Sequence, residues 1–184
     1  MIKLWLDSET TSTNPNKGFA FQYSYFAEEN NNILFFNDLK LCPTNYIDFE
    51  FDQKSLSLNK NSFEDIIKYK SEKEQIEKLK NDFNPFKEKF VICGYNIQFD
   101  IEFLKATLFR NKLDYFNYFQ FGYYDVMQLV KSLVVNDKIK VENIKLGTIA
   151  KYFGINDNNL HNAMQDITIT KQLNDIIIKN FNLN

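Results

Sequence analysis

Two carboxylates, Asp7 and Glu9, follow the apolar run Leu4–Leu6 near the start of the chain. Residues two apart on an extended segment point to the same side, so these like charges lie close together. Paired carboxylate oxygens suit a hard divalent cation such as Mg²⁺ or Mn²⁺. Because carboxylates at strand ends are often only solvated, a metal site here requires further acidic ligands from elsewhere in the chain.

A second polar group follows another apolar segment, Phe90–Gly94. Asn96 comes directly after it and Asp100 four residues later, a spacing that places both on one face of a helix. We therefore expect both to face a cleft at the end of the strand. A structural role is also compatible with this spacing, with Asn96 capping the helix and Asp100 stabilising its positive first turn.

The third group is "HNAMQD", His161–Asp166, which contains the only histidine of the chain. A polar stretch precedes His161, and an amphipathic segment that carries Asp166 follows it. A lone histidine is usually incidental, so His161 alone is weak evidence of a catalytic role. The significance of His161 therefore depends on whether the acidic groups converge.

The elements that position these groups follow from the spacing of apolar residues. Four aromatic residues alternate along Gly18–Phe26, and although they could stack on bases, we expect them to belong to the core. Asp125 is expected to cap the helix that follows it, and Gly154 to end another. We expect strands at residues 2–6, 18–26, 32–36, 90–94 and just before Asp125, and helices at 61–83, after Asp125, and at 97–109, 146–153 and 163–181.

Length and composition narrow the classes of protein. With 184 residues and 44% hydrophobic content, we expect one domain, residues 1–184. The net charge of −2 excludes a protein that holds nucleic acid by a broad basic face. The two cysteines are too few for a disulfide framework, and the apolar start ends at Asp7, too early for a signal peptide or membrane span. We therefore expect a cytoplasmic protein without a membrane partner.

Taken together, the three groups resemble the motifs of the DEDDh exonucleases, the DnaQ-like branch of the ribonuclease H-like superfamily. "DSET" resembles the motif D-x-E, "NIQFD" resembles N-x-x-F-D, and "HNAMQD" resembles H-x-A-x-x-D, in the order that the family has. "YYDVMQLVKSL" and "KLGTIAKYFGI" are similar to two further segments of the family. The resemblance covers nearly the entire chain.

This resemblance implies a fold, an activity and a ligand set. The fold is α/β and ribonuclease H-like, a mixed five-stranded sheet with its first three strands antiparallel, flanked by helices. The activity is 3′-to-5′ exonucleolytic release of nucleoside monophosphates from single-stranded DNA or RNA by two-metal-ion hydrolysis, with Mg²⁺ or Mn²⁺ as the cofactors. The implied catalytic residues are the general base His161 and the four metal-binding carboxylates Asp7, Glu9, Asp100 and Asp166.

Three residues are candidates for binding the substrate. Thr10 and Phe103 are placed to contact the terminal nucleotide, Thr10 through its hydroxyl or backbone and Phe103 by stacking or wedging. Packing within the helix is an equally weighted alternative for Phe103. Asn96 would orient Asp100 or the sugar.

The sequence also departs from the family pattern at two places. Ser12 and Thr13 stand where many relatives have a glycine that lets the nucleotide approach. Ile167 stands where the family usually has alanine, a difference that would shift the helix that carries Asp166.

Two alternatives to a stand-alone exonuclease stay open. One is a proofreading subunit that acts when docked on a DNA polymerase, and the other is an inactive nucleic-acid-binding domain. The first motif begins almost at Met1 and the chain ends with its last expected helix, which favours the stand-alone enzyme. A homodimer is also compatible with the sequence.

Overall fold

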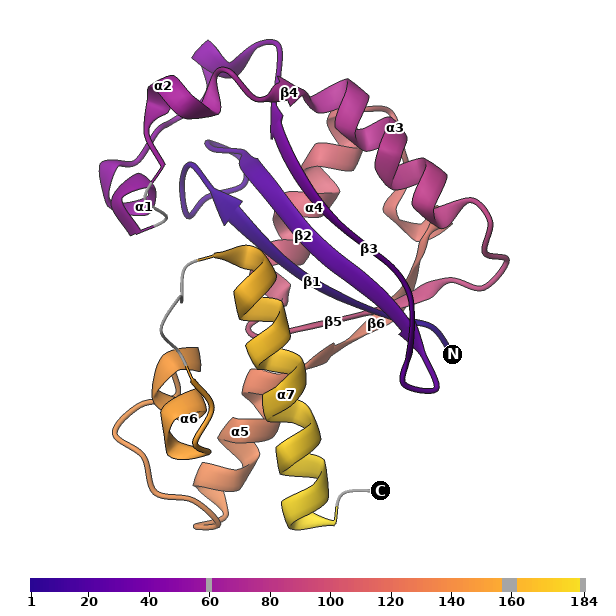
Figure 1. Cartoon of the computed structure of the whole chain (residues 1–184). Helices are drawn as coiled ribbons and strands as arrows, with labels where there is room; N and C mark the ends of the chain where they lie inside the picture. Colours follow the sequence, from indigo (N-terminus) through magenta and orange to yellow (C-terminus); the bar gives the residue numbers. More distant parts are fainter. Residues whose placement is uncertain (59–60, 157–161, 183–184) are drawn as a thin grey trace.

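A mixed sheet of six strands in the order β4-β3-β2-β1-β5-β6 forms the centre of the molecule (Figure 1). In this computed structural model, residues 1–58, 61–156 and 162–182 are described. Strands β1 to β3 form an antiparallel meander, and β5 and β6 continue the sheet in parallel on the other side of β1. The strands are β1 Lys3–Thr10, β2 Ala20–Glu29, β3 Asn32–Cys42, β4 Lys70–Ser71, β5 Phe90–Gly94 and β6 Phe119–Asp125.

The α/β class and the antiparallel order of the first three strands are confirmed, and the sheet has one strand more than expected. The extra strand is β4, a two-residue segment that pairs in parallel with the end of β3. A strand of two residues shows no periodicity, so its sequence carries no signal for it. Strand β1 also runs four residues beyond the expected Leu6, so that Asp7 and Glu9 lie within the strand itself.

Helices cover both faces of the sheet. Helix α4 packs on one face together with α3, and α7 lies across β1 and β2 on the other, with α5 and α6 beside it (Figure 1). Shorter helices, α1 and α2, cover the end of the meander over a small cluster built on Phe19 and Phe21. The α-helices are α1 Gln53–Leu58, α2 Phe63–Ile66, α3 Glu72–Phe83, α4 Gln98–Arg110, α5 Val126–Val135, α6 Leu146–Tyr152 and α7 Ala163–Phe181.

The alternation of β1 explains its central position. Leu4 and Leu6 join the core under α3 and α4, whereas Trp5 between them joins the core under α7. All three are at most 1% exposed. Because both faces of β1 are buried, its direction and register are fixed by packing, and so is the direction in which Asp7 and Glu9 point.

The four alternating aromatics of the second strand belong to the core, as expected. Phe19, Phe21, Tyr23 and Tyr25 are all 0% exposed, so none offers a ring to a base. The expected helix at residues 61–83 is wrong in its middle, where the chain forms α2, a turn, β4 and then α3. Ser71 accepts a hydrogen bond from the Glu74 amide and so caps the start of a new helix, α3. The sequence did not reveal this break, because the helical spacing of apolar residues continues across it.

The other helices confirm the sequence-based expectations within a residue or two. Asp125 caps α5 by accepting from the Met127 amide, and α6 ends just before Gly154, whose φ is +73°. Among the described residues, no helix combines the length and apolar character needed to cross a bilayer.

Gly94, the last residue of β5, provides a test of how tightly the sheet meets α4. A Cβ built on Gly94 would lie 2.8 Å from the Leu6 carbonyl oxygen and 2.5 Å from Ile97 Cδ1. Since the Leu6 backbone cannot retreat without moving β1, we expect Gly94→Ala to lower the free energy of unfolding by about 1–3 kcal/mol. The measurement is urea unfolding.

Gly122 in the exposed middle of β6 is the matched control, because a Cβ there meets nothing within 4 Å. Gly122→Ala should change the unfolding free energy by no more than about 0.5 kcal/mol. Equal effects of the two substitutions would show that the β5–α4 turn is not tightly packed.

Candidate active site

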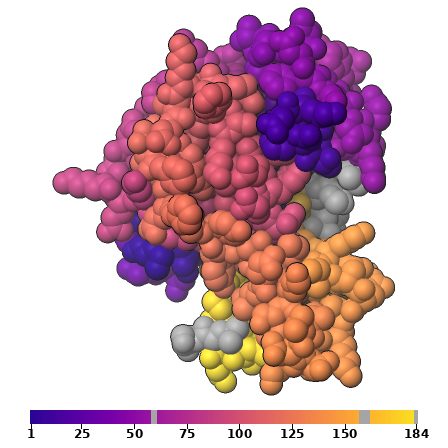
Figure 2. All heavy atoms as spheres, turned by 180° about the vertical axis from the view of Figure 1, so that it is seen from behind, coloured from indigo at the N-terminus to yellow at the C-terminus, as the bar shows by residue number. Residues whose placement is uncertain are grey.

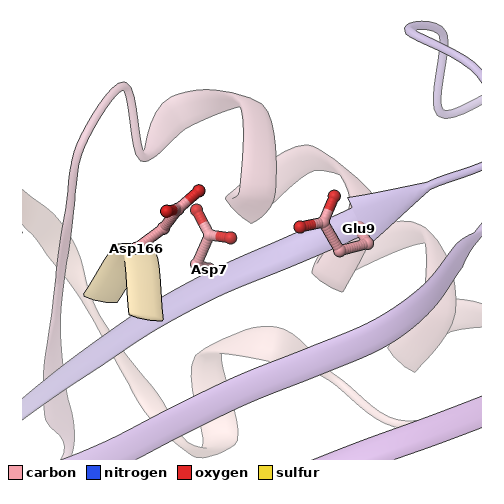
Figure 3. Close-up of side chains that lie close together, drawn as sticks. All are labelled: Asp7, Glu9 and Asp166. Atoms are coloured by element: carbon pink, nitrogen blue, oxygen red, sulfur yellow. The ribbon is translucent and has the colours of Figure 1, made fainter. Parts of the chain in front are cut away.

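Three carboxylates converge at the end of β1. One oxygen atom each of Asp7, Glu9 and Asp166 can be chosen so that all three lie within 4.8 Å of one another. Figure 3 shows Asp7 and Glu9 rising from the same side of β1, and Asp166 reaching toward Asp7 from the first turn of α7. Glu9 is buried, whereas Asp7 and Asp166 are half-buried. The chain thus brings together carboxylates that are more than 150 residues apart in sequence.

Helix α7 places Asp166 through its capped N-terminus. The Asn162 side chain accepts from the Gln165 amide, and the Asp166 amide donates to the Asn162 carbonyl oxygen at 2.9 Å. The next residue, Ile167, is 1% exposed and belongs to the core beneath α7. Isoleucine at this position therefore anchors the helix, and Asp166 still joins the two carboxylates of β1.

Asp100 approaches from the opposite layer of the molecule. It is 4% exposed, and its Oδ1 accepts from the Ser8 amide at 2.8 Å and from the Ser8 hydroxyl at 2.6 Å. Ser8 stands between Asp7 and Glu9 but points to the other face, so it holds Asp100 against β1. Asp100 is not part of the group of three carboxylates, yet its charge is the strongest single electrostatic influence on Asp7.

Asn96 acts through its backbone in this structure, and the expectation that its side chain caps α4 is wrong. Its φ is +56°, its side chain is exposed, and the N-cap of α4 is Ile97. The Asn96 amide donates to Asp125 Oδ1 at 2.9 Å. Asparagine tolerates the left-handed conformation that this sharp turn from β5 into α4 requires.

Asp125 is the residue whose role the sequence only half predicted. The same Oδ1 that caps α5 also accepts from the Asn96 amide, so one carboxylate joins the start of α5 to the turn before α4. The expected N-cap pattern reveals the first bond. The second joins residues 29 apart in sequence, and no local pattern predicts it.

The two remaining substrate-binding candidates are both buried. Thr10 is 5% exposed, and its hydroxyl donates to the Ser12 carbonyl oxygen at 2.8 Å, which closes the turn after β1. Phe103 is 1% exposed and belongs to the core, in agreement with the packing alternative. Phe99, whose ring centroid lies 5.0 Å from that of Phe103, is the partly exposed ring of this pair.

Ser12, one of the two residues that depart from the expected glycine of the motif, lies against a glycine from another segment. A Cβ built on Gly18 would lie 2.5 Å from the Ser12 Cβ, so the two segments meet where only one of them carries a side chain. Ser12 is buried and Thr13 is exposed. His161, the expected general base, lies outside the described residues and stays a prediction.

Burial and mutual repulsion disturb the titration of the site. Burial first, and then the charges of Asp166 and Asp100, raise the pKa of Glu9 from 4.5 to about 8. Burial and the charges of Asp100, Glu9 and Asp166 raise the pKa of Asp7 well above its usual range. Burial raises the pKa of Asp100 to about 7, although its bonds from Ser8 oppose the rise. Such a site favours binding of positive charge.

Comparison with known protein families identifies the class of protein to which the chain belongs. A family model described as exonuclease matches residues 4–173. The chain therefore belongs to this exonuclease family, the DnaQ-like branch of the ribonuclease H-like superfamily. No curated protein sequence gives a significant match.

Among solved structures, the chain is similar to exonuclease I of E. coli. A zinc-bound complex of that enzyme with single-stranded DNA has a TM-score of 0.84 at 18% identity, covering 97% of this chain and 40% of that one. The complex of that enzyme with a dT13 oligonucleotide has a TM-score of 0.82 at 18% identity, and the match covers 96% of this chain and 41% of that one. A product-bound structure of exonuclease I has a TM-score of 0.81 at 16% identity, and the match covers 97% of this chain and 43% of that one. The chain spans about two fifths of the length of these proteins, and the likeness shows the fold.

The raised pKa values predict how stability depends on pH in EDTA. The folded protein keeps protons on Glu9 and Asp100 that the unfolded chain has already released, so their contribution is complete below about pH 4 and is lost as the pH rises to about 8. We expect the free energy of unfolding to fall by at least about 1 kcal/mol between about pH 5 and pH 8.5. Urea unfolding at a series of pH values measures this.

Asp7→Asn should flatten that pH dependence and stabilise the metal-free protein at about pH 8.5, because it removes one of the repelling charges. The matched control is Asp175→Asn, which alters an exposed aspartate of the same helix that carries Asp166. A steep fall that persists in the Asp7→Asn protein would contradict the assignment of the pH dependence to this site.

Proposed function

We propose that the protein is a metal-dependent 3′-to-5′ exonuclease that releases nucleoside monophosphates from the 3′ ends of single-stranded DNA or RNA. The observation that carries this proposal is the convergence of Asp7, Glu9 and Asp166, with Asp100 held beside them, in a chain of the exonuclease family. Similarity to exonuclease I in complex with single-stranded DNA supports a single-stranded substrate. We also propose that residues 1–184 form one exonuclease domain and act in the cytoplasm, where the unpaired Cys42 and Cys93 would stay reduced.

The residues of the site fit divalent cations. All the proposed ligands are carboxylate oxygens, as Mg²⁺ and Mn²⁺ prefer, and the raised pKa values of Glu9 and Asp100, caused first by burial, mean that a bound cation would favour their charged forms. Asp7, Glu9 and Asp166 would hold one cation, and Asp7 with Asp100 the second. When bound, such a pair of ions neutralises the charge of the scissile phosphate and lowers the pKa of the attacking water.

The remaining chemistry belongs to side chains and backbone. His161 would take the proton of the attacking water as its oxygen bonds to phosphorus and the bond to the 3′ oxygen of the preceding nucleotide breaks. Ser8 fixes the direction of Asp100 through two hydrogen bonds. The closed turn at Thr10 and Ser12 would border the terminal nucleotide and keep the strand from passing through, which favours an end over an internal bond.

The first test uses 5′-labelled single-stranded DNA and RNA of one sequence with Mg²⁺ or Mn²⁺, with EDTA as the metal-free control. We expect a ladder that shortens from the 3′ end. Asp166→Asn should lower the rate at least about 100-fold, because a ligand of the cation is lost. Asp175→Asn, on the same helix, should leave the rate unchanged. A folded protein that digests neither strand, or that shortens them from the 5′ end, would refute the proposal.

His161→Ala provides a separate test of the general base. Loss of the base should lower the rate constant of hydrolysis about 10²- to 10⁴-fold, with metal binding retained because the carboxylates are intact. Single-turnover digestion measures the rate constant, and the shift in melting temperature on adding Mn²⁺ measures metal binding. Full activity of the variant would rule out the base, and loss of the melting shift would make His161 part of the metal site.

A further inference from the structure

Two hollows adjoin each other beyond Asp166. The first has a volume of about 610 Å³, lies between the β5–α4 turn and the segment that leads into α6, and has Asp166 in its wall. The second has a volume of about 460 Å³ and lies on the outer side of α6. Gly147 and Thr148 line both, so the two hollows adjoin, and we call them together the track along α6.

The wall of the first hollow is held in place by hydrogen bonds. The Tyr95 hydroxyl donates to the Ile144 carbonyl oxygen at 2.5 Å. Asn143 Oδ1 accepts from the Lys145 amide at 3.0 Å and from the Thr148 hydroxyl at 2.8 Å. Lys145 therefore lies on a hydrogen-bonded wall of the same hollow that Asp166 lines.

The charges along this track differ from those of the whole chain, whose net charge is −2. Lys145 lines the first hollow, and Lys140 and Lys151 line the second, where Glu142 is the opposing carboxylate. All three lysines are exposed, and none forms an ion pair with another described residue. Tyr152, 49% exposed, lies at the far end.

A larger hollow of about 1010 Å³ on the outer side of α4 lacks this character. Two of its three cations are paired, Arg110 with Glu72 and Lys105 with Glu102, so among the described residues only its Lys112 is without an ion pair. Figure 2 shows the molecule from behind, with the segments of α4 and β6 in the middle and the orange segment that includes α6 below them. The track along α6 has three lysines without an ion pair to another described residue, and Asp166 lies in its wall. It is therefore better suited than the hollow at α4 to hold the phosphates of a nucleic acid that enters the site.

We propose that the single strand preceding the scissile phosphate runs from Asp166 past Gly147 and Thr148 to Lys151 and Tyr152. Its phosphates would lie near the three lysines and one of its bases against the Tyr152 ring, the combination by which proteins hold single strands without reading their sequence. This inference rests on the proposed function and adds to it a path for the part of the polymer that stays uncut.

Binding to a catalytically silenced Asp7→Asn protein tests the path. We would measure the dissociation constants of fluorescent DNA and RNA strands of two and six nucleotides in Mg²⁺ by anisotropy, over a series of salt concentrations. In that background, Lys140→Ala with Lys151→Ala should weaken six-nucleotide binding about fivefold or more. The slope of log affinity against log salt should fall by about 0.7 for each lysine. Dinucleotide binding should weaken less, because two nucleotides do not reach the second hollow.

Lys87→Ala is the matched control, since Lys87 is exposed just before β5, at the end of that strand opposite to the carboxylates. Six-nucleotide binding and a salt slope that match those of this control would overturn the path, and so would equal losses for the two strand lengths. Hydrolysis by the intact protein is scored separately. A strand that binds as expected but is never cut would uphold the path and refute the exonuclease.

Discussion

Repulsion among carboxylates is the constraint around which this fold is arranged. Burial, and then the charges of Asp100 and Asp166, raise the pKa of both Asp7 and Glu9, so the chain gains nothing in stability by placing these carboxylates together. They stay together because each sits on an element fixed by apolar burial: β1 between two cores, α4 in one of them and α7 in the other. Apolar packing on both faces of the sheet thus stabilises the fold against the unfavourable free energy of placing these carboxylates together at the end of β1.

Successive side chains of β1 point alternately to the two faces of the sheet, and this alternation divides the polar contacts of the site between the two helical layers. Asp7 and Glu9 look toward α7, whereas Ser8 between them looks toward α4 and holds Asp100 by two hydrogen bonds. Asp125 then joins the turn before α4 to the start of α5. Neighbouring residues of β1 therefore connect the two helical layers to the site, in addition to the apolar packing of each layer on the sheet.

Much of this could be predicted from the sequence, because the signals are local. Period-two aromatics, the Asp125 cap and the glycine after α6 each depend on a few adjacent residues. The break between α2 and α3 and the strand β4 depend on pairing with the end of β3, which no window around residue 70 contains. In the site, too, local motifs predicted part of the arrangement and tertiary contacts determine the rest. The motifs predicted the three carboxylates that converge, whereas the Ser8–Asp100 hydrogen bond and the backbone role of Asn96 depend on segments that are distant in sequence.

The position of α7 in the sequence also has a consequence for how the protein comes into being. Its first turn supplies Asp166, whereas the partners of Asp166 lie on β1, more than 150 residues earlier in the chain. Contacts of such long sequence separation form late in folding, since the loop between them must close first. During synthesis the sheet can begin to assemble around β1, but no nascent chain that stops short of residue 166 holds the complete carboxylate trio. The growing polypeptide should therefore lack the complete set of carboxylates until α7 has docked on the sheet.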